Sequence, residues 1–444
     1  MEQDVTTPAP QRQKGAMIAI VTMMFLYAMI AFVTNLAAPI GVVMKMDPEV
    51  GGSNFLAMLG NFMVFLAYLF MGIPSGKLLT KIGYKKTALA GIAFGFIGVL
   101  IQFISGIESF EGYSDNVIYL IGAFISGMSV CMLNTVVNPM LNLIGGGGKR
   151  GNQLNMMGGT FNSLSATITP IFVGALIGQI TDKTDFADIN LVLYIAMAVF
   201  AFAFLVLAFV PIQDPEMGKV TADTKFERSP WAFRHFVLGA IGVFIYVGVE
   251  VGIPGTLNFY LSDTTAKGAG LVTNAAAIGG MVAGTYWLLM LVGRVIGSSI
   301  ASRVSAKVMM TAVTAVGMLL ILGAIFIDKS VTTSMPVFDK TTFVMETVPV
   351  SALLLVLCGL CTSVMWTSVF NLATEGLGKY TAAASGIFMM MVVGGGVLPL
   401  IQNAIADSEL GYMISYIVPL IGLAYLCFYA VAGCKNVNKD IKVD

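Results

Sequence analysis

One glutamate, Glu250, stands inside the long apolar run YVGVEVGIPGTLNFYL at residues 246–261. A carboxylate at the centre of a membrane-spanning helix costs about 2.5–3.5 kcal/mol on insertion scales, so a function or a partner is expected to offset it. Burial disfavours the charged form, so such a group can bind and release a proton. It can also hold a sodium ion, because hard cations prefer oxygen ligands. The pattern predicts that Glu250 is the ion-coupling residue, and a protonated structural glutamate is the alternative.

Amide side chains recur inside several apolar segments at spacings that share a helix face. Amides facing lipid are costly, so these faces are expected to point into the helix bundle. An amide offers a donor and an acceptor, and an indole offers a flat apolar face, which together suit the hydroxyls and C–H face of a sugar. For any single amide, a hydrogen bond that merely joins two helices is the alternative. The predicted substrate-binding residues are Asn35, Asn134, Asn138, Asn162, Tyr246, Asn258, Trp366, Asn371, Gln402 and Asn403.

Within this set, Trp366 is expected to stack on the sugar ring. We expect no basic residue at mid-membrane depth, which argues against an organic anion as substrate.

The chain offers little for catalysis, metal binding or cofactor binding. Its single histidine, His235, falls near a helix start without a Ser, Cys or metal-ligand partner. The run GGGGKRGN at 145–152 lacks the Ser or Thr that follows the lysine of a phosphate-binding loop. The five cysteines lie in or at the ends of apolar segments and form no metal-binding pattern. We therefore expect no enzyme, no catalytic or metal residues and no cofactor.

The composition is that of an integral membrane protein. Hydrophobic residues make up 57% of the chain and charged residues 11%, with a mean hydropathy of +0.87, whereas soluble proteins carry about 25% charged residues. The net charge of zero gives no indication of a nucleic-acid partner. In lipid the backbone must satisfy its own hydrogen bonds, so the spans are expected to be helices. Twelve spans are predicted near 16–44, 54–76, 86–107, 117–144, 155–180, 190–211, 233–261, 271–300, 307–327, 350–374, 381–406 and 412–433.

The distribution of charged and polar residues along the chain predicts an all-α architecture of two six-helix bundles. Most of the 24 lysines and arginines fall on the side that holds both termini, which assigns that side to the cytoplasm. The predicted organisation is a tail at 1–15, a first bundle at 16–211, a polar linker at 212–232, a second bundle at 233–433 and a tail at 434–444.

Two stretches with ordered glycines and basic residues mark equivalent positions in the two bundles. GIPSGKLLTKIGYKK (72–86) joins the second and third spans, and GRVIGSSIASRVSAK (293–307) joins the eighth and ninth. The first resembles the loop 2–3 signature of the major facilitator superfamily, with Thr80 where many members have an aspartate. The predicted gating residues of these cytoplasmic loops are Gly76, Lys77, Lys81, Gly83, Lys85, Arg294 and Arg303.

Longer segments narrow the resemblance. FNSLSATITP (161–170), the run at 246–261, GRVIGSSIASRVS (293–305) and the segment at 368–407 are similar to the fucose/galactose/glucose proton symporter family of that superfamily. The resemblance implies the twelve-helix fold and import of a hexose or deoxyhexose by alternating access, driven by an inward cation gradient across a bacterial inner membrane. It also implies sugar contacts for Asn35, Asn138 and Asn162.

The chain departs from this family at three positions. Ala38 and Asn134 stand where proton-coupled relatives carry carboxylates, and Gly159 replaces a glutamine. These departures increase the weight on Glu250 and leave proton, sodium or no coupling open. The expected partners are a small neutral sugar, a coupling cation and the lipid bilayer, with the protein acting as a monomer. The alternatives are a drug or neutral-metabolite antiporter of the same fold, an uncoupled sugar facilitator and a non-transporting membrane sensor.

Overall fold

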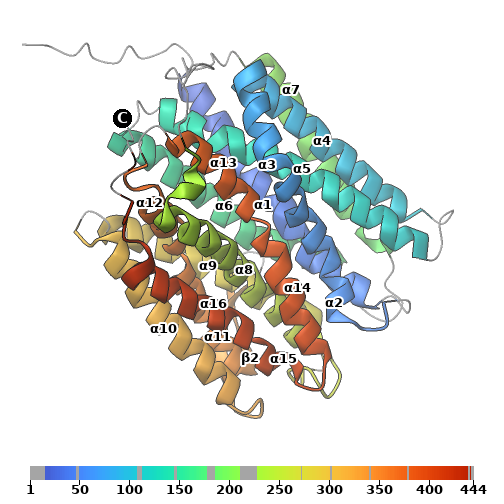
Figure 1. The fold of residues 1–444 in the computed structure, drawn as a ribbon. Coiled ribbons are helices and arrows are strands. Elements are labelled where there is room, and N and C mark those ends of the chain that lie inside the picture. The colour runs from blue at the N-terminus through green and yellow to red at the C-terminus, as the bar shows by residue number, and fades with distance from the viewer. Residues whose placement is uncertain are drawn as a thin grey trace, which may run out of the picture.

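Long α-helices, each of which satisfies its own backbone in lipid, dominate the computed structural model (Figure 1). The structure describes residues 16–46, 50–107, 113–144, 148–177, 186–210, 228–271, 273–300, 303–339, 342–377, 380–438 and 441. The first half contains α1 (Ala16–Met46), α2 (Asn54–Ala57), α3 (Leu59–Ile82), α4 (Tyr84–Ser105), α5 (Tyr113–Ile144), α6 (Gly148–Ile177), a 3₁₀ turn (Phe186–Ile189) and α7 (Asn190–Phe209).

The second half follows the same plan with more interruptions. It contains a 3₁₀ turn (Pro230–Ala232), α8 (Arg234–Ser262), α9 (Ala275–Ile300), α10 (Ala306–Phe326), α11 (Val350–Thr362), α12 (Met365–Thr374), α13 (Thr381–Met391), α14 (Gly394–Asp407), α15 (Gly411–Ser415), α16 (Ile417–Phe428) and a π-helical turn (Tyr429–Gly433). Three predicted spans of this half are therefore broken helices. The break between α13 and α14 precedes Gly394, where a Cβ would lie only 1.8 Å from the Phe244 carbonyl oxygen, so α8 and α14 approach closely at this point.

Within the described residues, eleven helical segments are long and apolar enough to cross a membrane. They coincide with eleven of the twelve predicted spans. The remaining prediction, 155–180, corresponds to α6, a continuous 30-residue helix whose glycines and polar side chains lower its hydropathy. Residues 178–180 of that prediction lie outside the described part of the chain.

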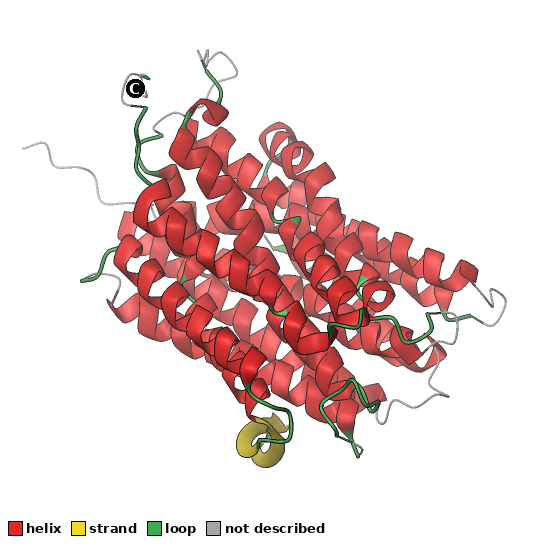
Figure 2. Cartoon of the chain, turned by 60° about the horizontal axis from the view of Figure 1, so that its bottom comes forward, coloured by secondary structure: helices red, strands yellow, loops and turns green. Residues whose placement is uncertain are grey.

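A β-hairpin departs from the expected all-helical architecture. Strands β1 (Thr332–Asp339) and β2 (Thr342–Pro349) pair antiparallel, with Thr332 opposite Pro349, between the predicted spans 307–327 and 350–374. Met335, Val337 and Val348 are buried, in keeping with the two-residue period of a strand with one packed face. The hairpin lies at one end of the bundle, as the yellow strands of Figure 2 show.

The helix bundle has two ends, the hairpin end and the tail end. The hairpin end contains β1, β2, α2 and α15, which lie at the bottom of Figure 1, and the tail end contains the described C-terminus, which lies at the top. The two halves meet where α6 contacts α9, α3 contacts α13 and α14, α2 contacts α14, and α1 contacts α8. Most of the predicted linker, residues 212–227, lies outside the described residues.

Candidate substrate site and the hairpin-end contacts

Glu250 has a partner in the bundle. Its Oε1 lies 3.6 Å from Nη2 of Arg294, and the two side chains are only 14% and 25% exposed. Arg294 belongs to α9, six residues before its end, and not to the cytoplasmic loop where the sequence analysis placed it. The expectation that no basic residue lies at mid-membrane depth is also wrong, because the guanidinium reaches the level of Glu250. The pair is a largely buried carboxylate whose charge is balanced by a cation of the neighbouring helix.

Arg294 also joins the two halves. Its Nη1 donates to the Gly159 carbonyl oxygen at 3.0 Å and to the Ser163 hydroxyl at 2.7 Å, both on α6. Gly159 is the position where the family resemblance led us to expect a glutamine, and a Cβ added there would meet only the Arg294 guanidinium, at 3.7 Å. Because Gly159 has no side chain, the Arg294 guanidinium can occupy the space beside it.

Tyr246 and Trp366 lie beside this ion pair. Tyr246 is fully buried one turn before Glu250 on α8, close enough for its hydroxyl to interact with the carboxylate, although the hydroxyl makes no hydrogen bond of good geometry. Its ring is 6.1 Å from the half-buried Trp366 ring of α12, tilted by 47°. Asn371, predicted to share the Trp366 face, is exposed. The two lie five residues apart, which turns them about 140° from one another around a helix.

Three predicted amides of the first half come together through two tyrosines. The Tyr27 hydroxyl on α1 donates to Asn138 Oδ1 on α5, and Asn162 Nδ2 on α6 donates to the Tyr27 carbonyl oxygen at 3.3 Å. Asn138 Nδ2 donates to the Asn134 carbonyl oxygen, and Asn134 Nδ2 donates to the Tyr68 hydroxyl on α3 at 2.7 Å. Sequence reasoning missed both tyrosines, because the sequence does not distinguish an aromatic site residue in an apolar helix from one that only packs in the hydrophobic core.

The predicted amides Asn35, Asn258 and Asn403 have bonding partners elsewhere, whereas Gln402 differs. Asn403 Nδ2 donates to the Thr256 hydroxyl of α8 and to the Pro399 carbonyl oxygen, and Asn258 Oδ1 accepts from Ser262. Both amides are buried. The Asn403 bond joins α14 to α8, which matches the alternative role of joining helices, whereas the Asn258 bond lies within α8. Asn35 donates to the Ala31 carbonyl oxygen of its own helix. Gln402 is buried on α14, and its Nε2 has no partner.

The predicted gating residues of the first half lie at the tail end, around the junction of α3 and α4. Gly76, Lys77 and Lys81 belong to α3, and Gly83 forms the junction with a φ of 84°, a conformation that favours glycine. Lys85 Nζ donates to the carbonyl oxygens of Ala208 and Val210 at 2.9 and 2.7 Å, and so caps the C-terminus of α7.

Arg303 follows α9 in a turn at the tail end, where its backbone N–H donates to the Ile300 carbonyl oxygen. Its side chain is exposed.

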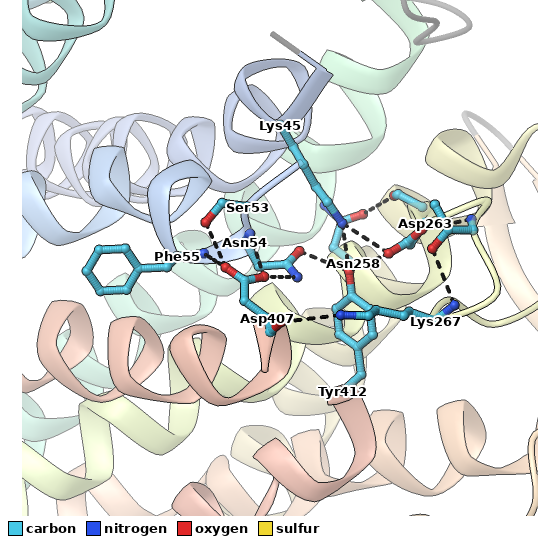
Figure 3. A network of polar contacts seen from close by, with 11 residues as sticks. Lys45, Ser53, Asn54, Phe55, Asn258, Asp263, Lys267, Asp407 and Tyr412 are labelled. Carbon is cyan, nitrogen blue, oxygen red and sulfur yellow. Dashed lines mark hydrogen bonds and ion pairs between the residues drawn. The ribbon is translucent and has the colours of Figure 1, made fainter. Parts of the chain in front are cut away.

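A second polar cluster closes the hairpin end (Figure 3). Lys45, near the end of α1, lies 3.3 Å from the Asp263 carboxylate and donates to the Tyr412 hydroxyl at 2.7 Å. The Tyr412 oxygen lies 2.9 Å from both Asn54 Oδ1 and Asp263 Oδ2. Burial acts to raise the pKa of Asp263, but hydrogen bonds from Thr265 and Tyr412 and the charge of Lys45 outweigh it and hold this pKa below its usual value.

Asp407, the last residue of α14, forms the other part of this cluster. Its carboxylate accepts from Ser53 Oγ at 2.7 Å, from Asn54 Nδ2 at 2.6 Å, and from the backbone N–H groups of Asn54 and Phe55 at 2.8 and 2.9 Å. Of the residues labelled in Figure 3, sequence reasoning selected only Asn258. It did not select the charged residues of this hairpin-end cluster, because charges at helix ends are ordinary in membrane proteins.

The protein consists of two helical halves that meet along several pairs of helices and share a polar cluster where they meet. This is the architecture of a membrane transporter. The family model "Major Facilitator Superfamily" matches residues 20–400. The chain belongs to this superfamily, which makes it a multi-pass membrane transporter rather than an enzyme.

Its relatives include named sugar transporters. A glucose/galactose transporter of Brucella abortus is 31% identical over 86% of each chain. The L-fucose-proton symporter of Escherichia coli is 22% identical over 85% of each. The crystal structure of the transporter FucP in the outward conformation covers 94% of this chain and 99% of its own, with a TM-score of 0.67 and 18% identity. The nucleoside transporter NupG gives a TM-score of 0.63 at 14% identity, over 93% of this chain and 98% of its own.

Proposed function

We propose that this protein is a secondary transporter that imports a hexose or deoxyhexose by symport with a cation. The observation that carries the proposal is the continuity of polar groups across the two halves at one level. The Tyr27, Asn138 and Asn162 network of the first half lies on α1, α5 and α6. The Glu250–Arg294 pair of the second half reaches that same α6 through Ser163. Relatives named for glucose, galactose and L-fucose support a sugar as the substrate.

The charge balance of the site supports a neutral substrate. Arg294 would attract an organic anion if it were unpaired, but Glu250 already balances its charge. The remaining groups are amides and hydroxyls, which can donate to and accept from sugar hydroxyls. Trp366, half-buried beside Tyr246, offers an aromatic face for the ring.

Coupling is proposed to operate through Glu250. A proton or sodium ion on this carboxylate competes with Arg294, which holds α6 of the opposite half. Binding of a proton or a sodium ion to Glu250 therefore changes how strongly Glu250 attracts Arg294. This gives a physical link between ion binding and the contact of the two halves. Ala38 and Asn134, at the positions where relatives carry carboxylates, supply no alternative acid.

The proposed membrane arrangement follows the charge distribution. Among the described residues, basic residues such as Lys77, Lys81 and Lys85 lie at the tail end, which we assign to the cytoplasm. We assign α6 as the twelfth span, because its contacts with α1 and α9 give its polar face protein partners instead of lipid. The protein is then a monomer in a bacterial inner membrane with both termini inside.

One observation favours an uncoupled facilitator as the second candidate. The Glu250 charge is already neutralised by Arg294, so the site needs no ion to become electrically balanced. The two functions differ in whether an imposed gradient drives accumulation.

Uptake into proteoliposomes tests both functions. Radiolabelled glucose, galactose and fucose are offered under a proton gradient, under a sodium gradient and under neither. Accumulation above equilibrium with only one of the two gradients is expected, and it identifies the cation. The variant Glu250→Gln should lose accumulation while it keeps sugar exchange, because the amide mimics the neutral carboxyl group. Equal accumulation by Glu250→Gln and wild type would refute the coupling role, and no transport of any hexose would refute the sugar assignment.

A further inference from the structure

The Asp407 carboxylate of the second half caps a helix of the first half. The first backbone N–H groups of any helix lack partners within the helix. At the start of α2, the Ser53 hydroxyl accepts from the Leu56 N–H, and the Asn54 and Phe55 N–H groups donate to Asp407. One half of the protein thus completes the secondary structure of the other half.

Asn54 and Tyr412 join this cap to the buried ion pair beside it. Asn54 donates to Asp407 through Nδ2 and presents Oδ1 to Tyr412, which also contacts Lys45 and Asp263. Asn54, Lys45 and Tyr412 are 4%, 8% and 2% exposed, so water is excluded from most of these contacts. Gly41 of α1 has no side chain, which lets α1 approach α2 of the same half and the Phe259 ring of the other half. A Cβ there would lie 2.7 Å from the Ala57 carbonyl oxygen and 3.2 Å from the Phe259 ring of α8.

Nearly all these bonds cross between the halves. Lys45, Ser53, Asn54 and Phe55 belong to the first half, and Asp263, Asp407 and Tyr412 to the second. Separation of the halves at the hairpin end must break the four hydrogen bonds to Asp407 together with the Lys45 contacts, because the cluster is continuous (Figure 3). Once separated, every one of these groups can be satisfied by water, so the open arrangement is also permitted.

We propose that Asp407, with the Lys45–Asp263–Tyr412 group, is a conformational latch that holds the hairpin end closed. Asp407 is its dominant element, because its hydrogen bonds are charge-assisted and its acceptor is shared by two backbone and two side-chain donors. The Lys45–Asp263 pair contributes less, because desolvation offsets much of the attraction in a buried ion pair. The inference rests on the two-state motion of the proposed transporter, and not on the identity of the sugar or the ion.

Distances between spin labels on the two halves test the latch without any substrate. Ile107 and Val331 are exposed residues of the first and second half at the hairpin end, and paired labels there report its width by electron–electron double resonance. We expect Asp407→Ala to shift the population toward longer distances by about tenfold or more, the effect of losing a charge-assisted hydrogen bond. Glu409→Ala, which removes an exposed carboxylate two residues away, should leave the distribution unchanged. A distribution for Asp407→Ala equal to that of Glu409→Ala would overturn the proposal.

A cross-link provides a second test that does not depend on the stability of Asp407→Ala. The side chains of Asn54 and Asp407 are in contact, so the double variant Asn54→Cys/Asp407→Cys should form a disulfide under mild oxidation. Spin labels on the oxidised protein should report only the short hairpin-end distance, and reduction should restore the longer one. Persistence of the long distance in fully cross-linked protein would overturn the latch. Absence of sugar uptake by unlinked wild type would refute the proposed function alone.

Discussion

The two polar clusters differ in how completely their groups are paired. At the hairpin end, Asp407 accepts four hydrogen bonds and Tyr412 has three polar neighbours. In the mid-bundle cluster, Glu250 and Arg294 stand 3.6 Å apart and both remain partly exposed, while the Tyr246 hydroxyl is buried without a hydrogen bond. A saturated cluster stabilises one arrangement, whereas an unsaturated cluster retains capacity for a substrate or an ion. This difference is why we assign closure to the first and binding to the second.

The largest expected effect comes from removing Arg294. Arg294→Ala leaves the Glu250 carboxylate buried without its partner and deletes two hydrogen bonds to α6, so we expect a loss of about 3–5 kcal/mol of stability. Thermal unfolding in detergent measures it. Arg303→Ala, at an exposed position just beyond the same helix, is the matched control. The double variant Glu250→Gln/Arg294→Ala should recover part of the loss, since no uncompensated charge remains. Equal stability of Arg294→Ala and Arg303→Ala would show that the pair is not coupled to the fold.

A smaller effect is expected from the amides joined by Tyr27. Asn138→Ala or Asn162→Ala leaves polar groups on the bound sugar unpaired, at about 1–3 kcal/mol each. Sugar affinity should weaken by about tenfold or more in each variant, as measured by equilibrium binding to purified protein. Asn403→Ala serves as the control, because Asn403 bonds to Thr256 and Pro399 within the second half. Unchanged affinity in both test variants, or an equal loss in the control, would argue against a binding role for this group.

Trp366 should contribute less than the amides. If its ring stacks on the sugar, Trp366→Leu removes an aromatic contact of about 0.5–1.5 kcal/mol and weakens binding by roughly two- to tenfold. Substrate-dependent quenching of intrinsic fluorescence should decrease in the same variant. Trp231→Leu, at an exposed position of the tail end, should keep both. A normal affinity and normal quenching for Trp366→Leu would mean that the indole only packs against Tyr246.

The smallest effect is expected when the pH is changed and the width of the hairpin end is measured. The pKa of Asp263 is held below its usual value, so the favourable contribution of this carboxylate is present above the ordinary aspartate range and is lost only as the pH falls through the lowered pKa. The distance between labels at Ile107 and Val331 should therefore not change between about pH 8 and pH 6. Opening of the hairpin end within that interval would show that another group controls the latch.

The sequence by itself determined the helical segments and which residues within them are candidates for function. Apolar length predicts a span because lipid offers no hydrogen bonds to the backbone, and eleven predicted spans coincide with apolar helices of the structure. The same logic selected Glu250, since a carboxylate among sixteen mostly apolar residues is costly wherever the helix packs. It also selected Asn134, Asn138 and Asn162, whose network the structure brings together.

Only the tertiary structure decided what those residues contact. Helical periodicity fixes faces within one segment, but it does not fix how α8, α9 and α6 are rotated and shifted against one another. Arg294 therefore looked like a loop cation until the packing of α9 placed it beside Glu250 and Ser163. Asn258 and Asn403 were predicted from their spacing as site amides, but only the packing shows that they bond to Ser262 and Thr256 of the second half. Asp407 and Asn54 lie at opposite ends of the chain, and no local pattern relates them. Their contact exists because the two halves close on one another at the hairpin end, where a partly buried carboxylate must find donors.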